Sequence, residues 1–566
     1  MPLKFSLSLA LLVLAAFVLA TGKPAAAAQY DLVIDETEVN VTGEPVKALT
    51  INGSLPAPTL RFKEGEDVTV RVTNRLDETA SVHWHGFLIP PEMDGVPGLS
   101  GFPGIESGET FTYRFSIRQT GTYWYHSHSG TQEQAGLYGS IIVEPAKGDI
   151  VKADRDYIVV LSDFTIEDSD RILANLKVDS GYYNYNKRTI VDFFRDIGRE
   201  GLGATIRDRL DWGAMRMDPT DLSDVSGYTF LVNGRSPDQN WTGLFTPGEK
   251  VRLRFINASA MTYYDVRIPG LKMIVIQADG QNVQPVPVDE FRIPVAETYD
   301  VIVTPEDEKA YTIFAEAIDR SGYARGTLAP REGMTGEIPE RRPRTLLTMA
   351  DMGMAHEGMA DGDMPGMQDG GMAQMEHGVM SDMSGMDHDS MNDMSGMARE
   401  ADASEADEPR GWADASTPKG MRALSYGDLK SLTPQKDTRE PTREIVVRLG
   451  GNMERYIWTI NGAKFEDTKP IDLNYGERVK LTFVNETMMP HPMHLHGMFV
   501  QLINGQPAER LPNKHVVNVA PGTSYSVLLT ANEPGEWALH CHLLYHMAAG
   551  MMTKVVVAQM TAEAAR

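Results

Sequence analysis

The sequence predicts an all-β protein with three homologous β-sandwich domains and a disordered, methionine-rich insert before the third domain. The first observation is a pattern that occurs three times, beginning at Asn52, Asn233 and Asn461. Each copy runs from an Asn-Gly pair to a Gly-Glu pair 12 to 14 residues further on, and then to another asparagine nine residues later. The second observation is an alternation of apolar and polar residues before that last asparagine, which is typical of half-buried strands. Three copies therefore predict three related domains.

The insert is predicted from a break in composition. Residues 349–397 contain 14 methionines, and residues 349–408 contain 15 acidic residues against one basic residue, Arg399. Glycine, serine and aspartate separate the methionines, and no apolar periodicity remains. Such a segment cannot bury enough apolar surface to fold, so we expect it to be disordered.

These patterns divide the chain into six segments. In chain order we expect a secretory signal peptide at 1–28, domain 1 at 29–150, domain 2 without metal ligands at 151–348, a Met/His/Asp-rich acidic insert at 349–408, a linker at 409–440 and domain 3 at 441–566.

Residues 1–28 have the parts of a secretory signal peptide. Lys4 provides a positive start, residues 5–20 form an apolar run, and Ala26 and Ala28 fit a small-x-small cleavage site. A retained membrane anchor is the alternative, but the run is shorter than the roughly 20 residues of a membrane span. Because no twin-arginine pair is present, we expect general secretory export rather than the twin-arginine route. The predicted location is the periplasm, with no membrane anchor.

Composition excludes several classes of protein. With 42% hydrophobic and 23% charged residues, the chain resembles an ordinary soluble globular protein. Its net charge of −25 argues against binding to nucleic acid or to an anionic membrane. The single cysteine, Cys541, excludes a disulfide scaffold.

The three repeats differ in their histidines. Nine and eleven residues past the last asparagine of the pattern, domain 1 has His83 and His85, and domain 3 has His494 and His496. Domain 2 has no histidine, and we interpret it as a spacer. Residues i and i+2 of a strand lie on one face, so each pair directs two imidazoles the same way. A second match places His126-Ser127-His128 and His540-Cys541-His542 each five residues after a glycine.

Cys541 indicates the kind of metal site in domain 3. Imidazoles with one thiolate, without a CxxC pair, favour copper over zinc. His546 and Met551 follow Cys541 by five and ten residues, and His491 comes from an earlier strand. Two histidines, one cysteine and a weak axial methionine form a blue-copper electron-transfer site.

The eight remaining paired histidines, four from each terminal domain, are expected to meet between domains 1 and 3. Eight imidazoles suit three copper ions, with two ligands on one ion and three on each of the others. Cys541 lies between His540 and His542, so electrons have a short covalent path from the blue copper to this cluster. A site that collects single electrons and a three-metal cluster together suit the four-electron reduction of O₂ to water.

These motifs resemble those of multicopper oxidases. The motifs that carry the resemblance are His83-Trp84-His85-Gly86, Trp124-Tyr125-His126-Ser127-His128, His491-Pro492-Met493-His494-Leu495-His496-Gly497, and His540-Cys541-His542 through Met551. With Asp94-Gly95-Val96-Pro97 and the methionine-rich insert, the chain is most similar to the periplasmic copper-resistance (CopA-type) subgroup. The resemblance implies three cupredoxin-like Greek-key domains and four copper ions per chain.

The resemblance also implies a role for each ligand. By motif, the type 1 copper takes His491, Cys541, His546 and Met551; the type 2 copper takes His83 and His494; the type 3 pair takes His85, His126 and His542 on one ion and His128, His496 and His540 on the other. Cys541 and Asp94 are the residues assigned to catalysis, Cys541 as electron conductor and Asp94 as the carboxylate that helps to deliver protons to oxygen. A turn residue before Gly95 is the alternative for Asp94. Some relatives have a second carboxylate directly after the type 1 histidine, where this chain has Met547, so the proton route on that side stays open.

The favoured electron donor is Cu(I), with Cu(II) as the product and copper resistance as the biological role. Thioether sulfur is a soft ligand that favours Cu(I), and the segment from Met349 to Met397 is rich in it. Met489, two residues before His491, is the expected docking point. Relatives have a carboxylate at the position of Thr487, which Glu486 could replace.

Two other functions remain open: a laccase acting on phenols or aromatic amines, and a non-enzymatic periplasmic protein that sequesters copper. The expected partners are O₂, Cu(I) or a small reducing substrate, and periplasmic copper-handling proteins, with no nucleic acid. We expect a monomer. His515 has no assigned role and is expected to be a surface or core residue.

Overall fold

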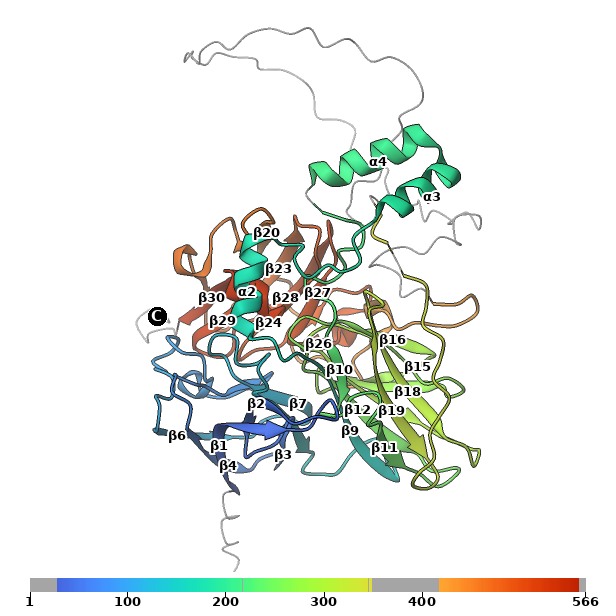
Figure 1. The fold of residues 1–566 in the computed structure, drawn as a ribbon. Helices are drawn as coiled ribbons and strands as arrows, with labels where there is room; N and C mark the ends of the chain where they lie inside the picture. Colours follow the sequence, from blue (N-terminus) through green and yellow to red (C-terminus); the bar gives the residue numbers. More distant parts are fainter. Residues whose placement is uncertain (1–27, 216, 345, 349–416, 559–566) are drawn as a thin grey trace, which may run out of the picture.

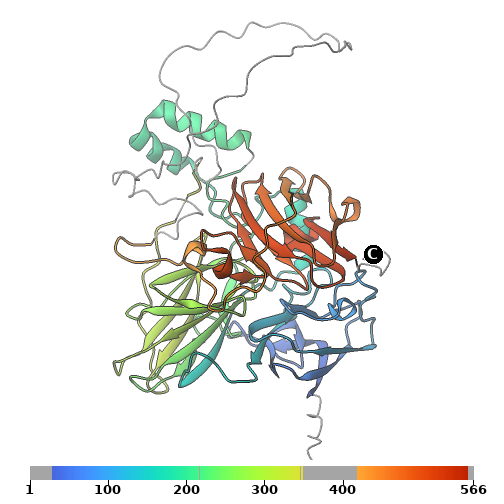
Figure 2. The ribbon, with the colours of Figure 1, turned by 180° about the vertical axis from the view of Figure 1, so that it is seen from behind.

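A computed structural model describes residues 28–215, 217–344, 346–348 and 417–558. The chain forms three β-sandwiches, coloured blue, green to yellow, and orange to red along the sequence in Figure 1, and Figure 2 shows them from behind. The prediction of an all-β protein with three cupredoxin-like domains is confirmed. The predicted signal peptide up to residue 27 and the predicted insert lie outside the described residues.

Domain 1 has two four-stranded sheets that pack around one core. The first sheet, in spatial order, contains β2 (Val46–Ile51), β1 (Ala28–Val39), β4 (Asp67–Asn74) and β6 (Thr110–Ser116). The second contains β3 (Ala57–Lys63), β8 (Tyr138–Glu144), β7 (Gly121–His126) and β5 (His83–His85).

Domain 2 has a six-stranded and a five-stranded sheet. The first contains β10 (Thr229–Val232), β9 (Arg155–Phe164), β12 (Val251–Asn257), β17 (Thr298–Val303), β14 (Met273–Ala278) and β15 (Gln281–Val288). The second contains β11 (Trp241–Leu244), β19 (Tyr323–Ala329), β18 (Tyr311–Ala317), β13 (Tyr264–Arg267) and β16 (Glu290–Ile293).

Domain 3 repeats the arrangement of domain 2. Its first sheet contains β21 (Ile457–Ile460), β20 (Arg443–Asn452), β23 (Arg478–Asn485), β28 (Ser524–Thr530), β25 (Val500–Leu502) and β26 (Asn513–Lys514). Its second contains β22 (Ile471–Asn474), β30 (Met552–Ala558), β29 (Gly535–Cys541), β24 (His491–Leu495) and β27 (Val516–Val519).

The same pairings occur in all three domains. A parallel pair lies in the first sheet of each, namely β1 with β4, β9 with β12 and β20 with β23. A parallel pair also lies in each second sheet, namely β3 with β8, β11 with β19 and β22 with β30. The other strand pairs are antiparallel. The structure therefore shows one topology three times, as the sequence repeat predicts.

The asparagines of the repeat explain why the sequence pattern recurs. Asn52, Asn233 and Asn461 each adopt a positive φ close to 50° in the turn, which asparagine tolerates better than most residues. Their side-chain Oδ1 atoms accept hydrogen bonds from backbone N–H groups of the neighbouring strand at 2.7, 2.8 and 2.9 Å. Each turn is thereby tied to the first sheet of its own domain.

The last asparagine of each copy joins the strand to the loop that follows. Asn74 and Asn485 each donate through Nδ2 to a backbone carbonyl four residues ahead and to carbonyls about 30 to 35 residues ahead, one for Asn74 and two for Asn485. Asn257 makes two such bonds in domain 2. Since the histidine pairs begin nine residues after Asn74 and Asn485, these bonds help to set where the histidine strands start.

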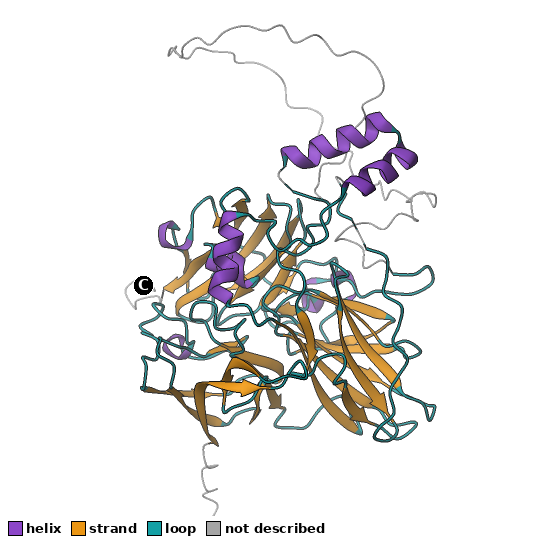
Figure 3. Ribbon diagram, viewed as in Figure 1, coloured by secondary structure: helices purple, strands orange, loops and turns teal. Residues whose placement is uncertain are grey.

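Helices lie outside the sandwiches (Figure 3). The α-helices are α2 (Ser169–Val178), α3 (Ile190–Glu200), α4 (Leu202–Ala214) and α5 (Leu544–Ala548), and the 3₁₀ turns are η1 (Pro91–Met93), η3 (Tyr426–Asp428), η4 (Phe465–Asp467) and η5 (Ala508–Arg510). Helices α3 and α4 form a hairpin that projects from the body of the protein (Figure 1). In the part of the chain that the structure describes, no helix is long and apolar enough to span a membrane.

Polar contacts, two of them buried, join the domains. Thr122 of domain 1 donates to Asp300 of domain 2 at 3.0 Å. The fully buried Lys514 of domain 3 lies 3.0 Å from Asp279 of domain 2. Arg118 of domain 1 forms two bonds of 3.0 Å with Glu533 of domain 3. All three pairs of domains are held together, which lets side chains from different domains build one site.

Candidate metal centres

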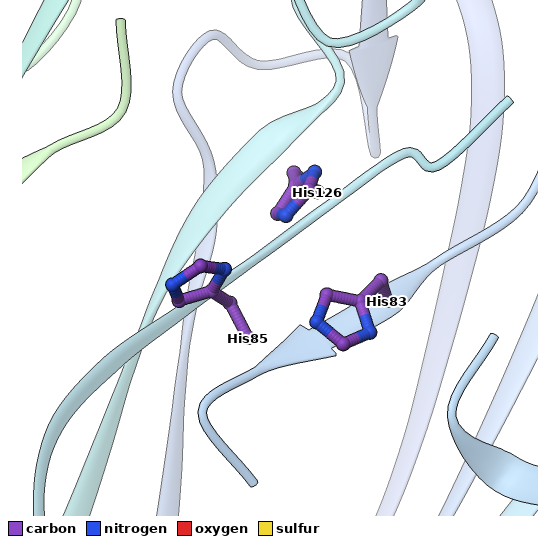
Figure 4. Close-up of side chains that lie close together, drawn as sticks. All are labelled: His83, His85 and His126. Atoms are coloured by element: carbon purple, nitrogen blue, oxygen red, sulfur yellow. The ribbon is translucent and has the colours of Figure 1, made fainter. Parts of the chain in front are cut away.

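The first site lies where domains 1 and 3 meet and is made of histidines on paired strands. In domain 1, His83 on β5 pairs in register with His126 on β7. In domain 3, His494 on β24 pairs with His540 on β29. Figure 4 shows His83 and His85 on one strand with the ring of His126 beside them. The alternation of side chains along a strand places both imidazoles of each pair on the buried face.

Rings from the two domains stack on each other. His83 stacks on His496 with ring centroids 3.9 Å apart, and His85 stacks on His494 at 3.8 Å. His128 and His540 bring their Nε2 atoms within 3.4 Å of each other. The predicted meeting of eight histidines between the terminal domains is therefore present in the structure, with every ring except that of His128 fully buried.

Several groups of three histidines have the spacing of a metal site. In each, one possible ligand atom from every residue lies within 4.8 Å of the others. The groups include His83 with His85 and His126, His83 with His494 and His496, and His128 with His496 and His540. The third group is the set that the resemblance assigns to one type 3 ion.

Backbone carbonyls select which nitrogen of each ring is free. Nδ1 of His83 lies 2.8 Å from the carbonyl of Asp94, and Nδ1 of His540 lies 2.9 Å from that of Cys541. A ring whose Nδ1–H donates to a carbonyl presents an unprotonated Nε2. The Nε2 atoms of His83, His126, His494 and His542 make no hydrogen bond to any described residue. Buried imidazoles in this state fit metal ligands.

Burial favours the neutral rings that metal binding requires. Removal from water lowers the pKa of His85, His126, His494 and His496 well below the usual value, and neighbouring imidazoles lower it further. Burial lowers the pKa of His540 to about 3. At neutral pH these rings are unprotonated and can bind a cation.

Two buried carboxylates contact the Nδ1 atoms of cluster histidines. Asp94 Oδ2 lies 2.8 Å from Nδ1 of His496, so the domain 1 aspartate orients a domain 3 imidazole. Asp94 also ends the turn η1, so the turn interpretation and the contact with the cluster both hold. Glu133, which the sequence reasoning missed, lies 2.8 Å from Nδ1 of His126 and 4.0 Å from Nδ1 of His542. Burial raises the pKa of Glu133 well above its usual range.

The second site lies inside domain 3 and contains the only thiol of the chain. Cys541 Sγ is fully buried, 3.5 Å from Nδ1 of His491 and 3.7 Å from Nδ1 of His546. Those two nitrogens are 3.2 Å apart. Met551 is also fully buried, and its backbone bonds to both Cys541 and His546. The four residues expected at a type 1 copper site are therefore gathered. Burial raises the pKa of the Cys541 thiol, so metal binding must displace its proton.

The outer nitrogens of both histidines have different partners. Nε2 of His491 lies 2.7 Å from the hydroxyl of Thr487, the residue that stands where relatives have a carboxylate. Nε2 of His546 lies 2.8 Å from Asp224 Oδ2, which also accepts a bond from Tyr456. Asp224 belongs to domain 2, so this domain contacts the Cys-His site although it carries no histidine. No sequence motif marks Asp224.

A cavity of about 490 Å³ lies beside this site. Five methionines line it, together with Trp458, Glu486 and Thr487: Met215, Met217, Met453, Met488 and Met489. Of these residues, the sequence analysis named Met489, Glu486 and Thr487. Met215 and Met217 come from the end of the α3–α4 hairpin and Met453 from the turn after β20. Met488 directly precedes Met489 and was not singled out. Met489 is buried, and the Glu486 side chain is half exposed and paired with Arg448. Thr487 connects the cavity wall to His491.

Of the two alternatives for His515, a surface or a core residue, the structure shows the second. The residue is 1% exposed, and its ring centroid lies 4.9 Å from that of His85 and 5.4 Å from that of His494. It forms a further three-histidine group with these two residues. Burial lowers its pKa to about 4.

Three cupredoxin-like sandwiches, a Cys-His site and an adjoining histidine cluster between the terminal domains define a copper-dependent oxidoreductase. The family comparison agrees over all three domains. Models of the multicopper oxidase family match residues 33–148, 155–333 and 438–561. The chain belongs to the multicopper oxidase family. The family's cofactor is copper, normally four ions per chain, and the buried histidine groups fit it.

Relatives with a stated role are close in sequence. The chain is 51% identical to copper resistance protein A of Escherichia coli, over 94% of this chain and 92% of that protein. It is 49% identical to copper resistance protein A of Pseudomonas syringae pv. tomato, over 95% and 94%. Among solved structures, Fet3p, a multicopper oxidase that functions in iron import, superposes with a TM-score of 0.65 at 18% identity, covering 94% of this chain and 90% of that one. The last likeness shows the shared fold.

Proposed function

We propose that this multicopper oxidase oxidises Cu(I) to Cu(II), passes the electrons to O₂, and thereby serves copper resistance in the periplasm. The observation that carries the proposal is the thioether-lined cavity beside His491. Thioether sulfur binds Cu(I) in preference to harder cations. The names of the two most similar relatives reported above support copper resistance as the role.

Each copper ion has a set of residues that would hold it. We assign the type 1 copper to His491, Cys541, His546 and Met551; the type 2 copper to His83 and His494; and the type 3 pair to His85, His126 and His542 on one ion and His128, His496 and His540 on the other. When bound, copper supplies one-electron redox chemistry at the first site and multi-electron chemistry at the cluster. The residues of the chain supply orientation, connection and proton transfer.

The chain connects the two sites covalently. Cys541 lies between His540 and His542, whose rings face the cluster while its own Sγ faces His491 and His546. An electron that arrives at the thiolate reaches either cluster histidine through a few bonds of one backbone. Asp94, which contacts His496 through Oδ2, is placed to hold a proton next to the cluster where oxygen is reduced.

The cavity gives Cu(I) a short route to the first site. Met488 and Met489 lie in the loop before β24, separated from it by Pro490, and Thr487 bonds to His491 at 2.7 Å. Glu486 lies at the half-exposed rim, where it is paired with Arg448, and its carboxylate could bind a cation when that pair opens. We propose that the segment from Met349 to Met397, which lies outside the described residues, concentrates Cu(I) for this cavity.

The test measures kcat/KM for two electron donors, Cu(I) and a soluble phenol, in a cavity variant and in a control variant. Replacing Met453 and Met488 together by leucine keeps the volume of the cavity but removes two sulfurs. We expect kcat/KM for Cu(I) to fall about tenfold, while kcat/KM for a soluble phenol stays unchanged. Met421→Leu, at an exposed position outside the cavity, is the matched control.

Unchanged Cu(I) kinetics, or equal losses on both donors, would contradict the proposed donor site. A wild-type protein that turns over the phenol but not Cu(I) would favour the laccase, and copper uptake without O₂ consumption would favour the sequestering protein. Deleting residues 349–408 should lower turnover with Cu(I) and leave the phenol unchanged or faster. Equal losses there would mean that the segment is structural.

We also propose a monomer exported by the general secretory route. Cell fractionation should find the mature chain in the periplasm, and light scattering should give the mass of one chain.

A further inference from the structure

The backbone of His515 is fixed from two sides. The residue lies between β26 and β27, and Asp279 of domain 2 accepts bonds from the N–H groups of His515 and Val516 at 3.2 and 3.1 Å. The His515 carbonyl lies 2.9 Å from Nδ1 of His494. His515 is therefore part of the framework that orients a cluster histidine.

The ring of His515 occupies space that the sequence leaves open for it. A Cβ atom at position 86 would lie 2.4 Å from Nε2 of His515, so the ring fits because residue 86 is glycine. Gly86 has φ +80°, in the region that favours glycine. Gly86 directly follows His85, so the chain that carries a cluster histidine also makes room for the ninth ring.

The nitrogens of His515 are in an unusual state. Neither Nδ1 nor Nε2 makes a hydrogen bond to any described residue, and Nδ1 is 4.0 Å from Asp279 Oδ2. Within the described cluster, His85 is the other ring for which this holds at both nitrogens. A buried polar atom without a partner is unfavourable unless a water or an ion satisfies it. His85 is an expected copper ligand, and the same explanation is available for His515.

We propose that His515 is a ninth copper-binding imidazole, which forms with His85 and His494 a loading site for the cluster. Possible ligand atoms of these three residues lie within 4.8 Å of one another. This inference rests on the copper assignment and not on the identity of the electron donor. Because His85 and His494 are assigned to different ions of the filled cluster, the three-histidine site is used while copper is being taken up.

The surroundings of His515 indicate a route for the ion. A cavity of about 640 Å³ between the three domains is lined by Gln119, Gly280 and Phe499 among others. The Phe499 ring lies 5.7 Å from that of His515, and Gln119 donates to the Gly86 carbonyl at 2.7 Å. Among the lining residues, Phe499 is thus a ring neighbour of His515, and Gln119 holds the glycine that makes room for its ring. His515 therefore faces the side of the cluster on which this cavity lies.

The test follows copper uptake by the full-length chain produced without copper. Cu(I) is added anaerobically, protein is desalted at intervals, and bound copper is measured by mass spectrometry. After oxidation, the blue absorption reports type 1 copper separately. We expect His515→Gln to slow uptake by the cluster about tenfold while type 1 copper is acquired at the wild-type rate. Tyr123→Phe, which changes a ring neighbour of His515 outside the cavity lining and keeps the imidazole, is the control and should match the wild type.

Wild-type uptake in His515→Gln would overturn the proposal, and equal slowing in Tyr123→Phe would overturn it by showing that packing around the ring is responsible. A second measurement does not depend on a folded variant. Wild-type crystals given one equivalent of copper should show an anomalous peak within bonding distance of a His515 nitrogen. A peak confined to the other cluster histidines would overturn the proposal.

Discussion

His126-Ser127-His128 in domain 1 and His540-Cys541-His542 in domain 3 have the same backbone arrangement and different chemistry at the middle residue. In both, Nδ1 of the first histidine lies 2.9 Å from the carbonyl of the middle residue. The Ser127 hydroxyl donates to Gln132 at 2.8 Å, whereas Cys541 Sγ faces two imidazoles. One strand geometry therefore supports either a hydrogen-bonded loop or a metal site.

The residues around the middle position explain the difference. At the positions that correspond by the repeat to His491, His546 and Met551, domain 1 has Ala80, Gln132 and Leu137. Gln132 uses its amide to bond with Ser127 and with Glu78. The shared framework thus has four corresponding positions, and all four carry possible copper ligands in domain 3 but not in domain 1.

The largest expected effect comes from making domain 3 resemble domain 1. In Cys541→Ser, an alcohol replaces the thiolate that binds type 1 copper. We expect the blue absorption to vanish and turnover with either donor to fall about a thousandfold or more. Visible spectroscopy and O₂ uptake measure the two effects. A colourless copper-loaded wild type would show that the Cys-His site is misassigned.

The next largest expected effect should distinguish the function of the histidine cluster from that of the Cys-His site. In His126→Ala or His496→Ala the cluster loses an assigned ligand, while all four residues around Cys541 remain. We expect unchanged blue absorption with O₂ reduction lowered about a hundredfold or more. Ser81→Ala, which removes a hydroxyl bonded to the His128 backbone, is the nearby control and should keep most activity. Full turnover in either histidine variant would contradict the assignment.

A smaller effect tests the different hydrogen-bond partners of the two histidines assigned to type 1 copper. His546 has a carboxylate partner, whereas His491 has a hydroxyl partner. Asp224→Asn removes a negative charge from the partner of His546, and negative charge stabilises Cu(II) over Cu(I). We expect the type 1 reduction potential to rise and copper affinity to fall about 10- to 100-fold. Thr487→Val removes a neutral partner from His491 and should shift the potential less. Redox titration of the blue band measures both, and equal shifts would refute a special role for domain 2.

The smallest effect concerns Ser127 itself. Ser127→Ala loses the bond to Gln132 at a cost of about 1 kcal/mol, which should lower the melting temperature of its domain by about 2–4 °C. The reverse replacement, Ser127→Cys, should not create a second blue site because Ala80 and Gln132 cannot bind copper. Calorimetry and visible spectra provide the measurements. A new blue band in Ser127→Cys would show that the thiolate alone specifies the site.

The copper-binding motifs were predictable because their residues are close in sequence. His83 with His85, His126 with His128 and the residues from His540 to Met551 each lie within one short segment. Strand alternation then gives their common face. The repeat asparagines were predictable for the same reason, since a turn and its neighbouring strand are local features.

The residues that contact the histidines of these sites from other segments could not be predicted in this way. Asp224 approaches His546 from a different domain, and Glu133 approaches His126 through a loop without a motif. Met215 and Met453 reach one cavity from positions more than 200 residues apart. Their meeting depends on how the domains pack, which no local spacing encodes.

The sequence by itself determined the three related domains, the histidine pairs and the position of the thiol between two histidines. The reason is that strand alternation and turns depend on residues that are close together in the sequence. The tertiary structure alone decided that rings of domains 1 and 3 stack, that His515 lies beside them, and that Asp224 of domain 2 contacts His546. The physical reason is that these contacts arise from side chains buried where domains meet, at distances set by packing rather than by position along the chain.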